Sequence, residues 1–369
     1  MKVVIAAAGT GGHINPGLAI ANKIQKEQTQ SEVLFIGTTY GLENDLVPRS
    51  GYPLKTIEAH GFSKEISIRN LKNIVGTIKG IGQAKKILQE FKPDIVIGTG
   101  GYICGPVMMA ARKLKIPTVL HESNAFPGKA VKMLSKKVNT VLVGFKEAKE
   151  RLPNAKRVVI TGTPTKIKEN FNIDKEKIKQ ELKLDSKLPI LLIFGGSQGA
   201  RTINNSILDL IFSNQIVNYQ IIWAPGPKQF DIIKQKLEEK NKDIKNIKNA
   251  KIIPYIYNME EMMNLADLLL CRSGAMTINE IAEVGKPSIL IPLPNVSQNH
   301  QEYNAKVLEK VGAAKIILDK DLNGEILNQT IQQLLEKEET LRQMGKNAKK
   351  IAVSDIEDKI YQEILKNLK

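Results

Sequence analysis

Short apolar runs alternate along the chain with longer stretches of helical periodicity. The runs are bounded by glycine, proline or charged residues, which is typical of strands buried in a parallel sheet. They lie at 3–8, 33–37, 94–98, 118–121, 140–144 and 158–161 in the first half, and at 190–194, 220–224, 251–253, 267–271, 288–291 and 315–318 in the second. Parallel strands need crossover connections, so the intervening stretches are predicted to be helices. The alternation predicts an α/β protein.

The alternation pauses once, around 161–164, and residues 166–187 are dominated by Lys and Glu, which indicates a linker near 162–188. A chain of 369 residues is also too long for one ordinary core. We therefore expect two Rossmann-like doubly wound domains facing across a cleft, at 1–163 and 164–349. The C-terminal helix, about 350–369, is expected to pack back on the first domain. Ligands should collect beyond the carboxyl ends of the strands.

Composition excludes several classes of protein. Hydrophobic residues make up 42% and charged residues 25%, and no apolar run reaches the roughly 18 residues of a membrane span, so a soluble globular protein is expected. The first strand begins without a secretion leader, which predicts a cytoplasmic protein. Cys104 and Cys271 form no CxxC or Cys/His cluster, so both are expected to be reduced and structural.

The net charge of +16 calls either for an anionic partner or for a genome whose codons favour lysine. A basic protein that binds nucleic acid would have such an anionic partner. However, the chain has no RNP-type aromatics, zinc finger or basic zipper, so no nucleic-acid partner is expected. An anionic membrane or a phosphorylated substrate fits the charge better.

One helical stretch, 61–91, combines apolar and basic residues. Its candidate membrane contacts are Leu71, Ile74, Ile78 and Ile81, with Lys72, Lys79, Lys85 and Lys86. An apolar stripe flanked by lysines can lie on an anionic membrane surface. The alternative is an ordinary amphipathic helix that faces the core and has a solvated basic edge.

The first strand runs into a glycine-rich loop, GTGGHINP at 9–16, and then into a helix. Such a loop directs backbone N–H groups and a helix end at phosphate. It is not a dinucleotide fingerprint, because position 14 is Ile, and it lacks the Gly-Lys-Ser/Thr of a Walker loop. His13 at the loop's exit could accept a proton from a hydroxyl. Alternatively, it is a capping or packing residue.

A second glycine-rich loop, at 195–199, follows the strand that opens the second half. Its N–H groups and the Ser197 hydroxyl suit a diphosphate, the alternative being a simple tight turn.

After the strand at 267–271, Thr277 and Glu280 share one helix face. Glu280 could accept both hydroxyls of a ribose, or it is a solvated helix residue or cap.

Two further polar segments follow strands, at 121–124 and 299–305, and the amides of the second could hold sugar hydroxyls. The acidic segment 319–321 superficially suggests a metal site. It has no partner ligands nearby in the sequence, so we predict a turn there.

Six motifs occur in a fixed order along the chain: GTGGHINP at 9–16, GTGGY at 98–102, HESN at 121–124, GGSQGA at 195–200, CRSGAMTINE at 271–280 and QEYNA at 301–305. On these motifs, over nearly its whole length, the chain resembles the MurG family of peptidoglycan glycosyltransferases. The resemblance implies the GT-B architecture and an inverting transfer of GlcNAc from UDP-GlcNAc to the C4 hydroxyl of undecaprenyl-diphospho-MurNAc-pentapeptide, without a cofactor. It also implies peripheral attachment to the cytoplasmic face of the bacterial plasma membrane, through the helix at 61–91. The alternative is another GT-B enzyme, such as a UDP-GlcNAc epimerase or a different lipid glycosyltransferase.

The resemblance also implies roles for individual residues. It makes His13 the base that deprotonates the acceptor, helped by Glu122, and it assigns the donor to the second domain. The implied substrate-binding residues are Thr10, Gly11, Gly12 and Asn124 in the first domain and Lys166, Ser197, Ile256, Ala275, Met276, Thr277, Ile278, Asn279, Glu280 and Gln301 in the second. Among these, Ser197 and Lys166 would contact phosphate, Ile256 uracil, Glu280 ribose and Gln301 the sugar.

The chain departs from the family's usual pattern at Ala8, Ser123, Thr163 and Lys166, where Gly, Gln, Asn and Arg are usual. Only the change at Lys166 alters the expected chemistry. A lysine offers phosphate a point charge in place of the two-pronged contact of an arginine.

Overall fold

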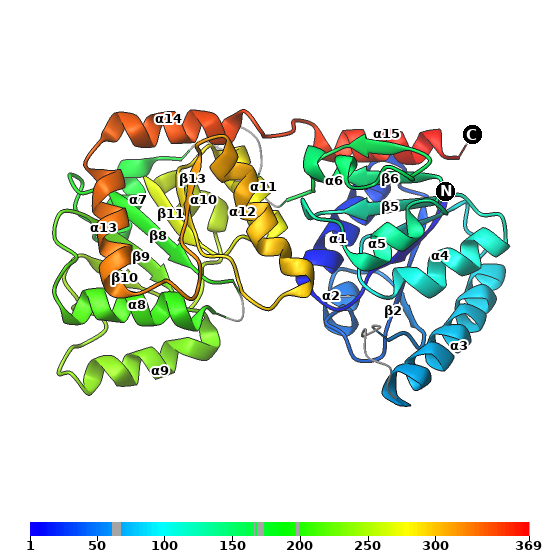
Figure 1. Ribbon diagram of the computed structural model, residues 1–369, viewed down its shortest axis with the longest axis horizontal. Coiled ribbons are helices and arrows are strands. Elements are labelled where there is room, and N and C mark those ends of the chain that lie inside the picture. The colour runs from blue at the N-terminus through cyan, green and yellow to red at the C-terminus, as the bar shows by residue number, and fades with distance from the viewer. Residues whose placement is uncertain (61–67, 166, 168–172, 197–198, 369) are drawn as a thin grey trace. The chain divides into compact units, whose positions relative to one another are not determined.

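A computed structural model describes residues 1–60, 68–165, 167, 173–196 and 199–368, and only the backbone of 68–75. The chain divides into two compact units (Figure 1). The first consists of Met1–Thr165 with Val353–Lys369, and the second of Lys166–Ala352. Each unit contains one parallel sheet with helices on both faces. The predicted fold class, two Rossmann-like doubly wound domains, is confirmed.

The sheet of the first unit has the strand order β3-β2-β1-β4-β5-β6-β7. Its strands are β1 (Lys2–Ala6), β2 (Glu32–Gly37), β3 (Leu54–Thr56), β4 (Ile95–Gly98), β5 (Thr118–Glu122), β6 (Thr140–Val143) and β7 (Val158–Ile160). The central strands are buried apolar runs, because helices cover both faces of the sheet. Strand β3 was not predicted: it is a short edge strand in which Lys55 and Thr56 are exposed, so it shows no apolar run.

The order of the strands reverses between β1 and β4, which pair from Val3–Ile95 to Ala6–Gly98. Loops that follow two such strands lie at the same carboxyl edge, where doubly wound sheets bind their ligands. The helices of this unit are α1 (Gly11–Glu27), α2 (Glu43–Arg49), α3 (Ile68–Phe91), α4 (Cys104–Lys113), α5 (Lys129–Leu134), α6 (Lys146–Glu150) and α15 (Ile356–Lys366). The β1–α1 loop therefore places His13 at the switch point of the first sheet.

The sheet of the second unit has the order β10-β9-β8-β11-β12-β13 and reverses between β8 and β11. Its strands are β8 (Ile190–Phe194), β9 (Gln220–Ala224), β10 (Ala250–Ile252), β11 (Leu268–Cys271), β12 (Ser288–Leu290) and β13 (Ala314–Ile316). Its helices are α7 (Lys175–Leu182), α8 (Arg201–Phe212), α9 (Pro227–Glu238), α10 (Met259–Leu265), α11 (Ala275–Val284), the 3-10 helix η1 (Ser297–Asn299), α12 (His300–Lys310), α13 (Gly324–Leu335) and α14 (Glu338–Lys349). The loops after β8 and β11 are the two glycine-containing segments predicted to bind the donor.

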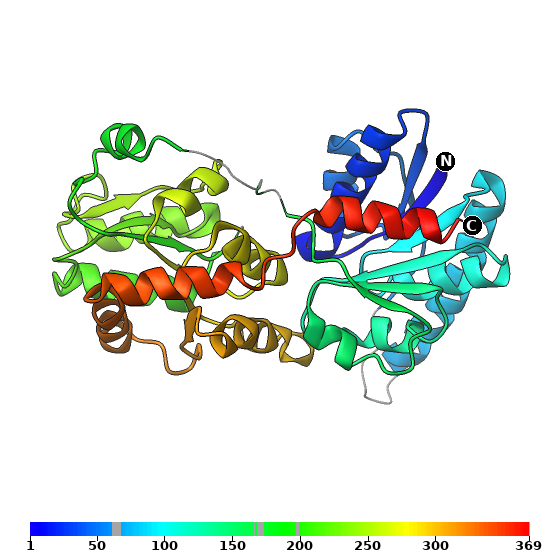
Figure 2. The same ribbon diagram turned by 90° about the horizontal axis from the view of Figure 1, so that it is seen from above.

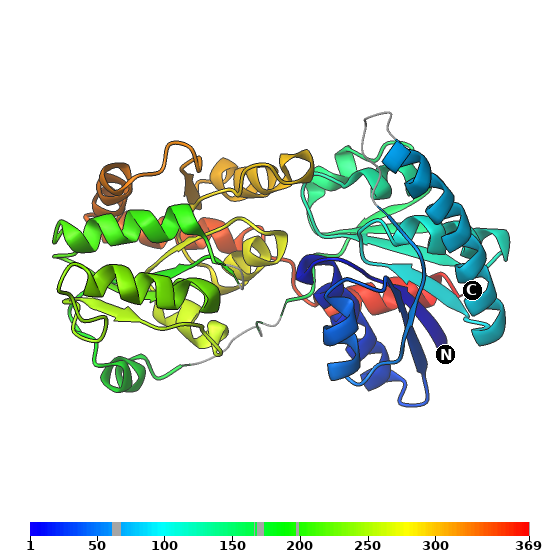
Figure 3. The same cartoon turned by 90° about the horizontal axis from the view of Figure 1, so that it is seen from below.

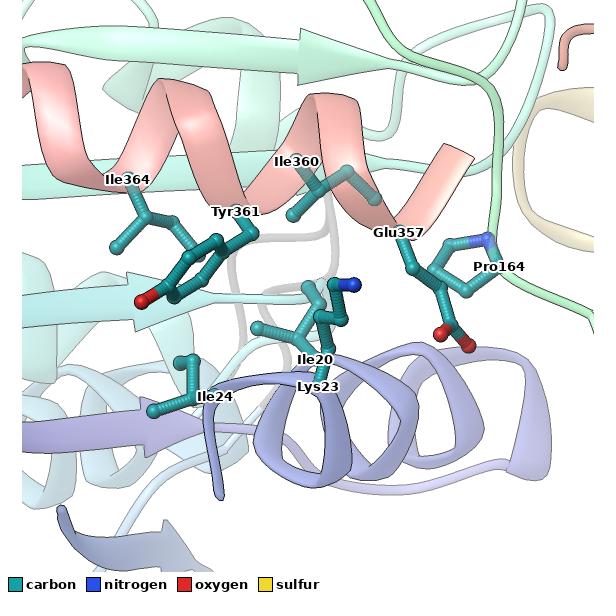
Figure 4. Close-up of a pocket in the computed structure, with 8 residues that line it drawn as sticks. All are labelled: Ile20, Lys23, Ile24, Pro164, Glu357, Ile360, Tyr361 and Ile364. Atoms are coloured by element: carbon teal, nitrogen blue, oxygen red, sulfur yellow. The ribbon is translucent and has the colours of Figure 1, made fainter. Parts of the chain in front are cut away.

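The C-terminal helix α15 belongs to the first unit, over which it lies in Figure 2. Figure 4 shows Ile20 and Ile24 of α1 opposite Ile360 and Ile364 of α15. At the edge of this apolar contact, the nearly buried Lys23 pairs with Glu27 (2.8 Å) and Asp358 (2.5 Å). The pKa of Lys23 is raised above its ordinary value, most of all by the hydrogen bond to Asp358 and next by the hydrogen bond to Glu27. The contact between α1 and α15 thus combines buried apolar area with an ion pair.

Helix α3 packs along α4 at one side of the first unit (Figures 1 and 3). Ala84 and Leu88 face the core, and Ile78 is 64% exposed. Ile81 packs against the same core, which makes it a partly buried residue and not a freely exposed one. None of the helices in the described part of the chain combines the length and apolar character that crossing a membrane requires.

Candidate active site

The β1–α1 loop carries the predicted base. Thr10 is the residue before α1, and Gly11, Gly12 and His13 form the first turn of the helix. The Nδ1 of His13 lies 3.2 Å from the carbonyl oxygen of Ala8. A carbonyl oxygen only accepts hydrogen bonds, so Nδ1 carries the proton of the neutral ring and donates it. The lone pair of His13 is therefore on Nε2, the nitrogen that can take up a proton.

The β4–α4 loop packs directly against the His13 ring. A β-carbon added to Gly100 would lie 2.5 Å from Cδ2 of His13, and Gly100 has a φ of +113°, a value that side chains rarely allow. The hydroxyl of Thr99 donates to the backbone oxygen of His13 at 2.7 Å. The GTGGY motif at 98–102 thus positions His13. Gly100 and Gly101 leave room for its ring, and the hydrogen bond from Thr99 holds the first turn of α1.

The predicted helper, Glu122, lies at the end of β5 and is 5% exposed. One of its carboxylate oxygens accepts from the backbone N–H (2.9 Å) and the side-chain amide (3.0 Å) of Asn124, and the other accepts from the N–H of Gly128 (2.8 Å). Glu122 therefore shapes the loop that carries the half-buried Asn124. A direct role of Glu122 in proton transfer stays a prediction.

His121 of the same motif points into the interior of the unit. Its Nε2–H donates to the oxygen of Gly162 (3.0 Å), and Ser123 Oγ donates to Nδ1 (3.4 Å). Burial lowers the pKa of His121 to about 4, against the opposing effect of the Gly162 bond. His121 is consequently a neutral structural residue at physiological pH.

In the second unit, glycines let the two loops at the end of β8 and β9 pack closely. A β-carbon on Gly195 would lie 2.6 Å from the nitrogen of Ala200, and one on Gly199 would lie 2.5 Å from the oxygen of Pro225. The N–H of Gly199 also donates to the oxygen of Gly196 at 2.9 Å. Ser197 and Lys166, the two predicted phosphate contacts, lie outside the described residues.

Arg272 connects the loops at the carboxyl edge of the second sheet, a role that sequence analysis missed. It pairs with Asp319 and donates to Thr202 Oγ1 (2.8 Å) at the start of α8 and to the backbone oxygen of Ile291 (3.1 Å) after β12. The segment 319–321 is a turn, as predicted. Asp319 nevertheless has a further function, because its carboxylate holds Arg272. No local pattern reveals this pair, whose members lie 47 residues apart.

Helix α11 begins directly after Ser273 and Gly274. Its first residues, Ala275, Met276 and Thr277, are half-exposed, and the first N–H groups of a helix have no partner within it. These N–H groups and the positive helix end can bind a diphosphate.

Three of the predicted contact residues have buried side chains. Ile278 is fully buried, and Asn279 is 7% exposed with its amide bonded to the oxygen of Ala275 (2.8 Å). Ile256 is 3% exposed, beneath an exposed pair formed by Tyr255 and Tyr257, whose ring centroids are 5.0 Å apart. The side chains of Ile278, Asn279 and Ile256 therefore pack inside the unit, and only their backbone can face a ligand.

Gln301, in the first turn of α12, is held against the start of α11. Its backbone oxygen accepts from Ser273 Oγ (2.8 Å), and its side-chain oxygen accepts from the N–H of Leu293 (2.9 Å). The amide is therefore oriented by the protein, with its oxygen engaged and its NH₂ group as the donor for a sugar hydroxyl.

Comparison with known proteins places these features in a family. Residues 3–143 match the glycosyltransferase family 28 N-terminal domain, and residues 190–360 match the glycosyltransferase family 28 C-terminal domain. The UDP-N-acetylglucosamine–N-acetylmuramyl-(pentapeptide) pyrophosphoryl-undecaprenol N-acetylglucosamine transferase of Acetivibrio thermocellus is 44% identical over 369 residues, covering 100% of this chain and 98% of the relative. The enzyme of the same name from Ruminiclostridium cellulolyticum is 44% identical over 98% of both chains.

Two solved structures extend the comparison. MurG of Acinetobacter baumannii superimposes with a TM-score of 0.81 at 30% identity and covers 99% of each chain. UDP-GlcNAc 2-epimerase from Neisseria meningitidis covers 99% of this chain and 100% of its own, with a TM-score of 0.62 at 16% identity, a likeness of fold alone.

Proposed function

Because the chain belongs to the MurG group of glycosyltransferase family 28, we propose that it transfers GlcNAc from UDP-GlcNAc to the C4 hydroxyl of undecaprenyl-diphospho-MurNAc-pentapeptide. The observation that carries the proposal is the 3.2 Å contact between Nδ1 of His13 and the oxygen of Ala8 at the switch point of the first sheet, from which we infer that Nε2 is the basic nitrogen. The relatives' names supply the substrates.

The chemistry is a displacement at the anomeric carbon of GlcNAc. Nε2 of His13 takes the proton of the acceptor hydroxyl, the hydroxyl oxygen forms the new β-1,4 bond, and UDP leaves with the electron pair of the broken bond. Charge then accumulates on the leaving diphosphate, which the N–H groups at the start of α11 can stabilise. We assign the acceptor to the first unit and the donor to the second.

A transfer assay tests the proposal. Labelled UDP-GlcNAc is incubated with a short-chain lipid-linked MurNAc-pentapeptide, and we expect a labelled disaccharide lipid and free UDP. An epimerase would instead interconvert the free nucleotide sugar without the acceptor. Epimerisation in the absence of lipid, with no transfer in its presence, would refute the proposal in favour of that alternative.

Glu280 provides a test of donor binding. Changing Glu280 to Gln should raise the Kd for UDP about tenfold, because a carboxylate that accepts both ribose hydroxyls contributes charge-assisted hydrogen bonds. Isothermal titration calorimetry measures this. Glu283→Gln, one turn further along the same helix α11, is the matched control and should leave the Kd unchanged. Equal affinities for all three proteins would show that Glu280 does not hold the ribose.

We also propose that α3 contacts the anionic membrane that carries the acceptor. Ile78 is 64% exposed, and Lys85 and Lys86 are exposed on the same helix. Lys79 already pairs with Glu58 (2.5 Å), so it contributes less positive charge than its position suggests. Nothing is described of the side chains of Leu71, Lys72 and Ile74.

Replacing Ile78 with serine should weaken sedimentation with anionic vesicles about fivefold, since one partly inserted isoleucine is lost. Ile81 is left intact, because it packs on the core and its loss would destabilise the unit. Ile232→Ser on α9 of the second unit, where Ile232 is 47% exposed, is the matched control. Equal vesicle binding by both variants and the wild type would remove Ile78 from the membrane contact.

A further inference from the structure

The peptide group between Ala8 and Gly9 is hydrogen-bonded on both sides. Its carbonyl oxygen accepts from Nδ1 of His13 at 3.2 Å, and its N–H donates to Oε2 of Glu43 at 2.9 Å. One amide thus connects the proposed base with a carboxylate at the start of α2, 30 residues further along the chain. No motif in the sequence marks Glu43, which follows a predicted strand.

Glu43 is fully buried, and the surrounding backbone is built to hold it. Its second oxygen accepts from the N–H (2.8 Å) and the hydroxyl (2.7 Å) of Thr38. A β-carbon on Gly41 would lie 1.9 Å from Oε2, and one on Gly37 would lie 2.6 Å from Cγ. Three donors directed at two oxygens suit the ionised carboxylate, which only accepts. Glu43 is therefore a fixed, buried negative charge behind the catalytic loop.

We propose that Glu43 is a positioning residue for His13, acting through the Ala8–Gly9 peptide. By accepting the N–H of Gly9, the carboxylate increases the negative charge on the oxygen of Ala8, because hydrogen bonds in a chain polarise one another. A more negative oxygen strengthens the bond from Nδ1–H, which fixes the tautomer with its lone pair on Nε2. It also stabilises the imidazolium that forms when Nε2 takes the acceptor's proton. The Nδ1 proton and the peptide proton both stay in place.

Other groups also lie close to His13 and to Glu43. The backbone of Gly100 and Gly101 packs against the His13 ring, and neither residue has a titratable side chain. Close to Glu43 lies Tyr40, which donates to the oxygen of Ala59 (2.6 Å) and stacks on His60. Burial, followed by the hydrogen bond to Tyr102, raises the pKa of Tyr40 above its ordinary value, so this phenol stays neutral.

The inference rests on the proposed function of His13, but its test reads the histidine directly. In Glu43→Gln, one carboxylate oxygen becomes an NH₂ group, which must face either Gly9 or Thr38 as a second donor. We expect the pKa of His13, followed by NMR of labelled imidazoles, to fall by about half a unit or more, because a nearby negative charge is lost. With four histidines in the chain, the His13→Ala spectrum identifies the resonance. The kcat for transfer should fall about tenfold, with the Kd for UDP unchanged.

Thr38→Val is the matched control. It removes one hydroxyl bond to the same carboxylate but keeps the charge and the bond to Gly9, so the titration of His13 should stay at the wild-type position. If Glu43→Gln does not fold, Glu43→Asp keeps the charge but draws it back from Gly9, and the pKa of His13 should still fall.

An unchanged His13 titration in a folded Glu43 variant overturns the inference. Failure of the proposed function has a different signature. In that case His13→Ala transfers GlcNAc at the wild-type rate, whatever Glu43 does to the imidazole.

Discussion

Replacing His13 with alanine is expected to lower the kcat for GlcNAc transfer by about 100- to 10,000-fold, the range that a general base supplies. The acceptor hydroxyl then has no group at the switch point of the first sheet to take its proton. The affinity for UDP should not change, because the proposed donor contacts lie in the other unit. Radiolabelled transfer at saturating donor measures kcat, and calorimetry measures UDP binding.

A second variant separates the base from its scaffold. His13→Asn keeps a side-chain N–H that can donate to the oxygen of Ala8, but it has no lone pair of suitable basicity. It should be as inactive as His13→Ala while unfolding at the temperature of the wild type. Wild-type turnover by His13→Asn would show that the ring anchors the loop and transfers no proton.

The second large effect is expected on stability. Asp319→Ala should lower the free energy of unfolding of the second unit by about 3 kcal/mol, because it leaves the Arg272 guanidinium largely buried without its partner. The single tryptophan of the chain, Trp223, is fully buried in β9. Its fluorescence during urea unfolding therefore follows the second unit specifically. The Kd for UDP should rise as well, since Arg272 holds the loops after β11 and β12 together.

Two controls accompany this variant. Asp321→Ala removes an exposed carboxylate from the same turn and should leave the urea midpoint unchanged. The double variant Arg272→Met, Asp319→Leu removes both charges and should recover part of the lost stability. If Asp319→Ala unfolds at the wild-type urea concentration, the ion pair is not what holds these loops.

Apolar patterning was sufficient to predict the fold because most strands are continuous buried runs such as β1 and β8. It did not predict β3. This edge strand pairs with β2 alone, and Lys55 and Thr56 are exposed, so no apolar run marks it. It also could not anticipate Glu43 or the pair of Arg272 with Asp319. Gly9 lies 34 residues from Glu43 and Asp319 lies 47 residues from Arg272, and an isolated Glu or Arg looks the same whether it is solvated or buried.

The sequence predicts where the candidate residues lie on the fold, but not which of their side chains are buried. His13 and the first turn of α11 lie at the strand ends where doubly wound sheets bind ligands. The sequence could not show that Ile278 and Asn279 turn inward, because the first turn of a helix presents its side chains around the whole axis. Nor could it show that the oxygen of Gln301 is already bonded to Leu293.

The packing of α15 on α1 has a consequence for the order in which the chain folds during synthesis. The first unit needs Ile360 and Ile364 to cover Ile20 and Ile24, and these residues leave the ribosome only after residues 166–352. Until then, one apolar side of α1 is open to water and to other chains. During synthesis, the first unit therefore exposes apolar surface of the kind that favours aggregation until α15 docks.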